Sequence, residues 1–404
     1  MDTDYTNQSL VSSYIFDIAN LCILYLFIFL IYKIKKFDNR LLFLLIISSL
    51  TPFLFNTSII SPTNFPDQGS YVSSSMNFRR SFFDPSYWYL KLESFTEDGL
   101  YENGKFNFRV FWANIRISSN AFLYSVMPFN IQTIKSIAFI NKFLFYLTIF
   151  FLLKKKAINN LIAIFLIISP TIIIHTSTSL RDIIVLLILI LGSFYTFKEK
   201  SFRMQILVCV LLALFRGQYL IVFLIFMFFE YFFYDYSNKK KLGFGIFILS
   251  SVFLLLLFFI EPVLEQINFL RAGFFAEENT YGNLAWQDAY QDIDLSVETL
   301  KTILIQNIRY VFTPLSISNI FLMILTIENF IILFVLGYFL YELQIKRKRI
   351  FDILILYFIS SNFFSILVFN IGSLYRYRFP LMFFYILTSY WMIKNKQITP
   401  KVLK

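Results

Sequence analysis

The chain has very few of the residues on which metal centres and disulfide frameworks depend. One histidine and two cysteines occur in 404 residues, which argues against a His/Cys metal centre. Cys22 and Cys209 both lie inside apolar runs, so a disulfide framework is not expected. We therefore predict neither a bound metal nor an organic cofactor.

Glycine-rich signatures are also missing. The chain has 11 glycines, and they form neither a Walker loop nor a dinucleotide-binding loop. A nucleophile elbow of the GxSxG type is absent as well. Any catalysis is therefore expected to be electrostatic and acid–base in character.

Charged residues are scarce, and apolar residues dominate. Charged side chains make up 15% of the chain and hydrophobic ones 58%, whereas soluble domains carry about 25% charged residues. Apolar runs of roughly 20 residues recur along the chain, and such runs are long enough to cross a bilayer. The composition predicts an all-α, polytopic membrane protein whose first partner is the lipid bilayer.

The formal net charge is +11, which by itself could indicate nucleic acid. The lysines cluster, however, in short loops between apolar runs, as at Lys154–Lys156 and Lys239–Lys241. This is the positive-inside pattern of membrane proteins, so no nucleic-acid partner is predicted. The acidic N-terminus, MDTDYTNQ, has no basic region typical of a cleavable signal peptide.

The lysine clusters define a topology. Placing all of them in the cytoplasm predicts about 11 transmembrane helices in a single integral membrane domain over residues 1–404. The N-terminus is then periplasmic and the C-terminus cytoplasmic. Two large periplasmic segments follow, residues 61–133 and residues 261–317. The first contains an interfacial or re-entrant helix over residues 109–129 that stays on the outer side, and the second a helix-like piece over residues 297–311.

Four sites in this topology carry arginine at the outer side, and Arg181 is one of them. Residues 204–236 form one apolar run with basic flanks and Arg216 in its middle. We expect two helices that meet near Arg216 and leave it in an outward-open cavity. The stretch GSLYRYRFP, residues 372–380, is predicted as an outer loop that exposes Arg376 and Arg378. Arg271 lies in the second periplasmic segment.

A hydrophobic helix is predicted to begin within residues 175–192, HTSTSLRDIIVLLILILG, with Arg181 and Asp182 at its N-terminus. An arginine at a helix N-terminus faces the positive end of the macrodipole and adds nothing to helix stability. Ionisable groups at membrane depth are costly and are kept mainly for function. We expect Arg181 to bind an anionic group at the outer face, while Asp182 either contributes to that site or caps the helix.

Arginines on the periplasmic side are unusual, because the positive-inside rule favours basic residues in cytoplasmic loops. The guanidinium fork suits phosphate oxygens, so an outer-leaflet lipid diphosphate is a plausible ligand for several of them. For each arginine, a headgroup-level anchor or an internal ion pair remains an alternative. The predicted substrate-binding residues are Arg181, Asp182, Arg216, Arg271, Arg376 and Arg378.

Two residues are candidates for acid–base work. Asp67 follows the second apolar run, and a carboxylate at a cavity rim can accept the proton of a hydroxyl. A solvated loop acid or an arginine partner is the alternative for Asp67. His175, the single histidine, is expected at the same outer rim and could also act as a base, with a satisfied polar residue as the alternative. Asp17, inside the first apolar run, is expected to have a structural partner.

The layout resembles a known family, the integral-membrane O-antigen or capsular polysaccharide polymerases of the Wzy type. They belong to the wider class of polyprenyl-linked membrane glycosyltransferases. Members have two large periplasmic loops with functional arginines, and some carry an Arg-x10-Gly pattern in both. Here Arg181 to Gly192 and Arg271 to Gly282 have that spacing, although the first pattern runs into a hydrophobic helix.

The resemblance implies a reaction at the periplasmic face of the bacterial inner membrane. A glycan on undecaprenyl pyrophosphate would be transferred to a hydroxyl of another lipid-linked repeat unit, without a metal. Periplasmic arginines would bind the pyrophosphate, and Asp67 or His175 would take the acceptor proton, with Arg181 in the catalytic set. A chain-length regulator and a flippase are possible partners. Sugars would stack on Tyr71, Trp88 and Trp286.

Other classes remain open. A polyprenyl-phosphate-dependent transferase of single sugars (GT-C-like) typically keeps an acidic pair in its first outer loop, but the residue after Asp67 is Gln68. A lipid-linked oligosaccharide flippase usually has short loops, whereas the long loops here lie on one side. A membrane acyltransferase would need a histidine near the cytoplasmic donor, and His175 is predicted to face outward.

Overall fold

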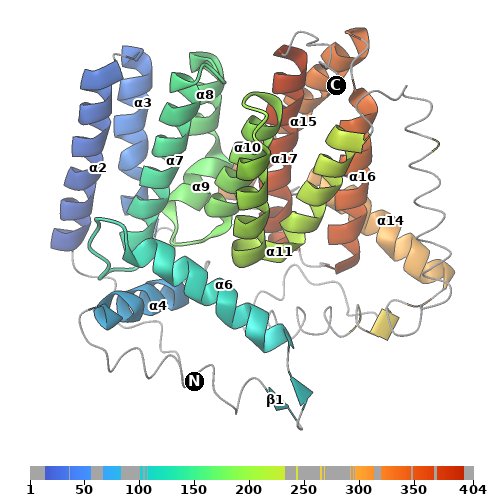
Figure 1. Cartoon of the computed structure of the whole chain (residues 1–404), viewed down its shortest axis with the longest axis horizontal. Helices are drawn as coiled ribbons and strands as arrows, with labels where there is room; N and C mark the ends of the chain where they lie inside the picture. Colours follow the sequence, from blue (N-terminus) through green and yellow to red (C-terminus); the bar gives the residue numbers. More distant parts are fainter. Residues whose placement is uncertain are drawn as a thin grey trace. The chain divides into compact units, whose positions relative to one another are not determined.

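The computed structural model describes most of the apolar helices and part of the connecting segments (Figure 1). The described residues are 14–35, 37–55, 67–82, 101–102, 105–106, 108–232, 243, 264–265, 268, 292, 294, 296–313, 320–346, 349–367 and 371–394.

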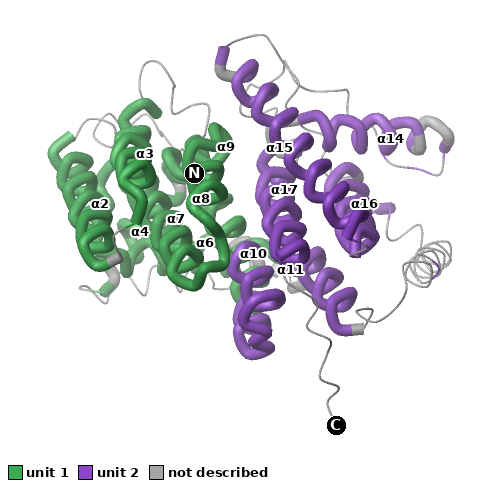
Figure 2. Tube along the Cα trace, turned by 90° about the horizontal axis from the view of Figure 1, so that it is seen from above, with its two compact units in different colours: residues 1–188, 210–217 green, residues 189–209, 218–404 purple. Residues whose placement is uncertain are grey.

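The chain forms two compact units, coloured separately in Figure 2. Unit 1 comprises residues 1–188 and 210–217, and unit 2 comprises residues 189–209 and 218–404. The single integral membrane domain expected from the sequence stays a prediction.

Helices make up almost all of the described structure, which confirms the helical fold class for those residues. The exception within the described segments is an antiparallel hairpin of two-residue strands, β1 (Tyr101–Glu102) and β2 (Lys105–Phe106).

The helices of unit 1 are α2 (Tyr14–Lys35), α3 (Asn39–Ser49), η1 (Thr51–Phe53), α4 (Asp67–Ser81), α6 (Phe108–Ser125), α7 (Ser136–Lys154), α8 (Asn160–Ile168) and α9 (Pro170–Ser177). Both α10 (Asp182–Phe197) and α11 (Phe202–Phe232) contribute to both units. Unit 2 also contains α14 (Val297–Phe312), α15 (Ile320–Ile345), α16 (Ile350–Leu367) and α17 (Ile371–Lys394).

Several helices begin at a side-chain cap that the sequence provides. The Asn159 side chain accepts a hydrogen bond from the Ile162 amide at 3.0 Å at the start of α8. Ser296 accepts one from the Thr299 amide at 3.2 Å at the start of α14. Such caps satisfy amides that have no partner inside the helix. Helix α14 matches the helix-like piece predicted over residues 297–311.

Four described helices are long and apolar enough to cross a membrane: α2, α7, α11 and α15. The bent pair α8–α9 raises this number to five if it counts as one span. The segments 39–53, 182–197 and 350–365 are shorter apolar helices. The structure thus fits an integral membrane protein, while the predicted total of about 11 spans and the two periplasmic segments stay predictions.

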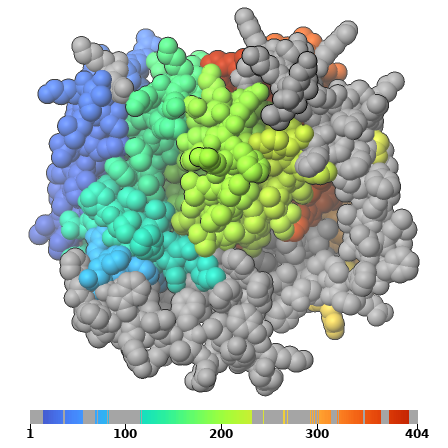
Figure 3. Space-filling view, viewed as in Figure 1, coloured from blue at the N-terminus to red at the C-terminus, as the bar shows by residue number. Residues whose placement is uncertain are grey.

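The outer surface of these helices is apolar. In the space-filling view (Figure 3), α2, in blue, forms an open edge of unit 1. Its Ile15 is 78% exposed. On the inner side of the same helix, Asp17 and Asn20 are buried. This reversal of the usual soluble pattern is what a lipid environment requires.

Buried polar groups on α2 have the structural partners expected for Asp17. The Thr133 hydroxyl donates to the Asp17 carboxylate. Asn20 makes a reciprocal pair with the backbone of Asn130, donating to its carbonyl and accepting from its amide, both at 2.8 Å. These contacts tie α2 to the segment before α7.

The apolar run over residues 157–174 differs from the single span that the sequence predicts. It breaks at Ser169 into α8 and α9, which are bent by 63°. Pro170 disfavours a helical conformation at Ser169, whose φ and ψ are −58° and 118°. The Ser169 hydroxyl then caps α9 by accepting from the Ile172 amide at 3.3 Å. A proline at the first helical position favours such a new start.

The long helix α11 contains the predicted interruption. Arg216 has φ −164° and ψ 87°, an extended conformation inside an otherwise helical segment. The prediction of two helices that meet near Arg216 is therefore confirmed. The first of them, residues 202–215, is the shorter.

The outer loop predicted over residues 372–380 is wrong. Helix α17 begins at Ile371 and continues through Pro380, so Arg376 and Arg378 lie on a helix. Gly372 and Pro380 suggested a loop. In an apolar environment, however, a continuous helix satisfies the backbone groups that a loop would leave without partners.

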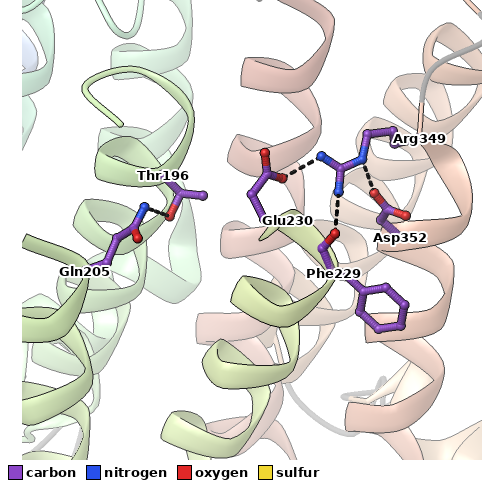
Figure 4. Close-up of polar contacts among 6 residues, drawn as sticks. All are labelled: Thr196, Gln205, Phe229, Glu230, Arg349 and Asp352. Carbon is purple, nitrogen blue, oxygen red and sulfur yellow. Dashed lines mark hydrogen bonds and ion pairs between the residues drawn. The ribbon is translucent and has the colours of Figure 1, made fainter. Parts of the chain in front are cut away.

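An ion-pair cluster connects the last turns of α11 to the start of α16 in unit 2 (Figure 4). The Arg349 guanidinium donates to Glu230 of α11 at 2.6 Å and to the Phe229 carbonyl at 3.3 Å, and it also pairs with Asp352 of α16. Burial lowers the pKa of Arg349, but the carboxylates of Asp352 and Glu230 outweigh this effect and raise it. The cluster lies next to the lysine-rich stretch after α15 that is predicted to be cytoplasmic.

Candidate functional site

Residues 178–181 join α9 to α10, and we call them the connector. Thr178 ends α9 in an extended conformation, with φ −112° and ψ 154°. Asp182 then begins α10. Three connector residues, Thr178, Ser179 and Leu180, are buried. Because buried backbone groups must find hydrogen-bond partners, the surrounding helices determine where the connector lies.

Asn141 of α7 supplies two of these partners. Its amide nitrogen donates to the Thr178 carbonyl at 3.0 Å and to the Leu180 carbonyl at 2.7 Å. Its own oxygen accepts from the Tyr124 hydroxyl of α6 at 3.1 Å. One buried amide therefore fixes both sides of the connector and is itself oriented by a neighbouring helix.

Ser179 is held by two further groups. Gln68 of α4 accepts a hydrogen bond from the Ser179 amide at 2.8 Å. The Ser179 hydroxyl donates to the Ile134 carbonyl. The connector thus contacts α4, α7 and the segment before α7. In the sequence, Gln68 lies 111 positions and Ile134 lies 45 positions from Ser179.

The last turn of α9 is also rich in buried polar contacts. Lys142 of α7 donates to the Thr176 hydroxyl at 3.0 Å and to the Ser48 hydroxyl at 3.2 Å. The hydroxyls of Ser177 and Thr51 lie 2.5 Å apart. Polar residues inside the apolar run of α7, namely Asn141 and Lys142, are a sequence signal for this network that our sequence interpretation missed.

Arg181 is the part of the connector that reaches the surface of unit 1. Its side chain is partly exposed, and its guanidinium carbon lies 5.5 Å from the ring centroid of Tyr71 on α4. This distance is typical of a cation–π contact. Among the described residues, no carboxylate forms an ion pair with Arg181. Arg181 therefore combines a fixed position with a positive charge that no described acid neutralises.

Arg216 is placed differently from the prediction. It is 4% exposed and forms a buried ion pair with Asp182. It is therefore not open to solvent, and the internal ion pair considered from the sequence is what the structure shows. The extended backbone at Arg216 interrupts α11 at this point, and the pair anchors that break to the start of α10.

Neither acid–base candidate has the position expected for it. Asp67 is the first residue of α4 and not a loop residue, and its side chain lies outside the described part. His175 is 1% exposed and lies inside α9, so it is not at an open rim. Their proposed roles stay predictions.

Several other predicted residues lie elsewhere. Arg376 is half-buried and Arg378 is buried, both on α17 in unit 2. Tyr71 contacts Arg181, and its expected stacking on sugars stays a prediction. The residues Trp88, Arg271, Gly282 and Trp286 lie outside the described residues.

Arg79 is a structural residue that sequence reasoning missed. Its guanidinium, in the last turn of α4, donates to the carbonyls of Ser125 at 2.9 Å and Met127 at 2.7 Å, and also to that of Phe129. These carbonyls lie at and just beyond the C-terminal end of α6, where a cation is favourable. Burial lowers the pKa of Arg79. No local sequence pattern indicates a contact over this separation.

The arrangement is suited to binding an anion. A guanidinium, an aromatic face and the positive end of α10 meet at one point. Within the described ranges, no group of three or more His, Cys, Asp or Glu residues is placed to hold a metal ion. No protein-family model, curated protein or solved structure matches this chain.

Proposed function

We propose that the connector and the start of α10 bind the diphosphate of a lipid-linked sugar donor. On this proposal the protein is a metal-independent glycosyltransferase that polymerises undecaprenyl-pyrophosphate-linked repeat units, as in O-antigen or capsule synthesis. The reaction takes place at the periplasmic face of the bacterial inner membrane.

The environment of Arg181 is the observation that carries this proposal. A guanidinium with no carboxylate partner among the described residues is held beside Tyr71 at a helix N-terminus. Oxyanions are the ligands that both the guanidinium fork and the helix dipole favour. The apolar exterior of the helices supports a ligand that is itself anchored in lipid.

The buried network gives Arg181 a fixed geometry. Asn141 and Gln68 hold the three residues before it, so little rearrangement is needed when an anion arrives. Preorganised donors are most effective where charge develops in a transition state. Here that charge develops on the departing diphosphate.

The ion pair of Arg216 with Asp182 supports the same site. Asp182 is the first residue of α10, and its carboxylate is already paired with Arg216. It therefore does not compete with a ligand anion for Arg181. Arg216 acts in the proposal as the neutralising partner of Asp182. Direct roles of Arg271, Arg376 and Arg378 at a diphosphate stay predictions.

The proposed transfer is a displacement at a sugar carbon. A hydroxyl of the acceptor repeat unit forms a bond to the anomeric carbon of the donor, and the bond from that carbon to the phosphate oxygen breaks. Undecaprenyl pyrophosphate leaves with the electron pair. The hydroxyl proton passes to a base, for which Asp67 and His175 stay the predicted residues.

Deletion of the gene in its host, followed by gel analysis of the surface polysaccharide, tests the reaction class. We expect loss of the ladder, with a single repeat unit still attached to its acceptor. Complete loss of the polysaccharide would instead indicate a transferase of single sugars or a flippase, and would contradict the polymerase proposal.

Complementation of the deletion tests the site. Arg181→Ala should leave the ladder absent while the protein stays in the membrane. The matched control is Arg203→Ala, because Arg203 is exposed in the first turn of α11, and this variant should restore the ladder. A wild-type ladder from Arg181→Ala would rule out the diphosphate site at α10.

A further inference from the structure

Helix α14 of unit 2 has an outward face that is apolar. Leu304, Ile305, Ile308 and Phe312 are 57%, 40%, 61% and 39% exposed. Spacings of three and four residues place these side chains on one side of the helix. Large apolar side chains gathered on one exposed face indicate that something apolar covers this face.

The opposite side of α14 is polar and packs inside unit 2. Gln306 and Tyr310 are buried there. The Tyr310 ring contacts the ring of Tyr357 on α16, with the centroids 6.2 Å apart. The Asn307 side chain donates a hydrogen bond to that of Asn362, also on α16, at 3.0 Å. Polar groups inside and apolar groups outside are the arrangement expected of a helix that faces lipid.

At its C-terminal end, α14 meets the exposed surface of α15. The ring centroids of Phe312 and Phe330 of α15 lie 6.4 Å apart. Phe330 is 49% exposed, and residues 322–345 of α15 are long and apolar enough to cross a membrane. The apolar face of α14 is therefore continuous with the exposed face of a candidate membrane span. This continuity favours lipid over a second protein as the neighbour of α14.

The place of Phe330 along α15 sets the depth of this end of α14. Phe330 follows Leu322, the first residue of the candidate span, by eight positions, or about 12 Å at about 1.5 Å per residue. The hydrocarbon core of a bilayer is about 30 Å thick, so one leaflet contributes about 15 Å. Phe312, beside Phe330, is therefore at the depth of the acyl chains.

Lys301 sets the depth of the other end of α14. It is exposed and lies on the same face as Ile308, two helical turns earlier. An ammonium group is costly among acyl chains and extends toward the lipid phosphates instead. With 16 residues, α14 is also shorter than the about 20 residues that cross a bilayer. Its oblique course beside α16 and α17 in Figure 1 fits a helix that is inclined within one leaflet.

We propose that α14 lies inclined in one leaflet of the membrane, with Lys301 at the level of the phospholipid phosphates and Phe312 among the acyl chains. This lipid-binding face goes beyond the diphosphate site proposed at Arg181 and does not depend on it. On this proposal, residues 297–312 of the second predicted periplasmic segment lie in the membrane and not in the periplasm.

A fluorophore on the outward face of α14 measures its depth. Leu304→Cys, Ile308→Cys and Phe312→Cys are made one at a time in the full-length protein, after Cys22 and Cys209 are replaced by serine. Each cysteine is labelled with an environment-sensitive fluorophore, and the protein is placed in phosphatidylcholine nanodiscs. Iodide is the quencher in water. Phospholipids with a nitroxide either near the headgroup or near the end of the acyl chain are the quenchers in the membrane.

Two exposed positions serve as references. Phe334, near the middle of the α15 span, is 77% exposed, so a label at Phe334→Cys reports a deep position. Glu199, an exposed residue after α10, reports water when it is replaced by cysteine. Iodide should quench the label at Glu199→Cys several-fold more strongly than the labels at Ile308→Cys and Phe312→Cys.

The two nitroxide lipids should reveal a gradient along α14. The nitroxide near the headgroup should quench the label at Leu304→Cys most strongly. The deep nitroxide should quench those at Phe312→Cys and Phe334→Cys most strongly, and the label at Ile308→Cys should lie between. The reason is that the helix carries each position deeper into the leaflet than the one before it.

Three results would overturn the proposal. Iodide quenching at Ile308→Cys equal to that at Glu199→Cys would place the face in water. No quenching at Ile308→Cys by any of the quenchers would show that protein, such as a second copy of the chain, covers the face. Equal depths at Leu304→Cys and Phe312→Cys would contradict the inclination, and Ile308→Cys replaces Phe312→Cys in this comparison if the latter does not fold. The polysaccharide gel for Arg181 reads out separately, so failure of one proposal leaves the other standing.

Discussion

Asn141 is the residue on which the geometry of the connector depends most directly. It donates to two backbone carbonyls that flank Ser179 and accepts from the Tyr124 hydroxyl. All of these groups are buried. A buried carbonyl that loses its donor is left with the full cost of its desolvation.

Asn141→Ala should therefore lower the free energy of unfolding by about 3 kcal/mol and should also reduce polymer formation, because Arg181 follows the freed residues. Thermal unfolding and the polysaccharide gel measure the two effects. Asn20→Ala is the control: it removes two part-buried hydrogen bonds, at 2.8 Å each, to the backbone of Asn130, which is not part of the connector. Equal loss of activity in the two variants would contradict a positioning role for Asn141.

At the residue scale, the sequence singled out Arg181 as a candidate anion-binding residue, but it did not predict the residues that hold the connector before it. Arg181 can be recognised from its immediate neighbours in the sequence, because it is a charged residue directly before a long apolar run. Arg216 also stood out, but its partner Asp182 lies 34 positions away, and no pattern in the sequence indicates that pair. The same holds for Gln68, which binds Ser179 over 111 positions.

At the element scale, Gly192 shows how tightly two helix segments of unit 2 are packed. A Cβ atom at Gly192 of α10 would lie 2.6 Å from Cε2 of Phe223 and 2.9 Å from Cγ1 of Val208, both on α11. Phe223 is fully buried, so its ring has little room to move. The glycine of the first Arg-x10-Gly pattern therefore has a packing role.

Gly192→Ala should destabilise the protein by about 1–3 kcal/mol through overpacking. Gly337→Ala is the control, because nothing lies within 4 Å of a Cβ atom there and alanine is the better helix former by about 1 kcal/mol. Thermal unfolding of the two variants compares them directly. A stable Gly192→Ala variant would show that α10 and α11 can separate at this point.

Most of the element positions could be predicted from apolar runs and their basic ends. The runs over residues 134–153 and 297–311 correspond to α7 and α14. The bend at Ser169 was not predicted, because the apolar run is continuous and a single proline decides its course. Helix α17 was not predicted over residues 371–378, because glycine, proline and two arginines there are also typical of a surface loop.

At the scale of the whole molecule, the membrane topology is a prediction that can be tested directly, by asking which loops lie on which side of the membrane. The positive-inside pattern places Lys155 in the cytoplasm and the segment before α7, with the exposed Gln132, in the periplasm. The two native cysteines, Cys22 and Cys209, are not in disulfides and have to be replaced before labelling.

A membrane-impermeant maleimide on intact spheroplasts should label Gln132→Cys and leave Lys155→Cys unlabelled, and both should react after permeabilisation. Glu199→Cys, an exposed position after α10, should behave like Lys155→Cys. Labelling of Lys155→Cys in intact cells would reverse the predicted orientation and remove the periplasmic site.

The way the connector is held also determines which amino-acid substitutions can affect Arg181. Side-chain amides and hydroxyls of α4, α6 and α7 hold the connector in position through hydrogen bonds. A displacement of any of these helices would therefore also move Arg181. Substitutions in these helices can therefore alter the proposed diphosphate site without touching Arg181. We expect variants with altered polymer length or rate to arise inside these scaffold helices as well as around Arg181 itself.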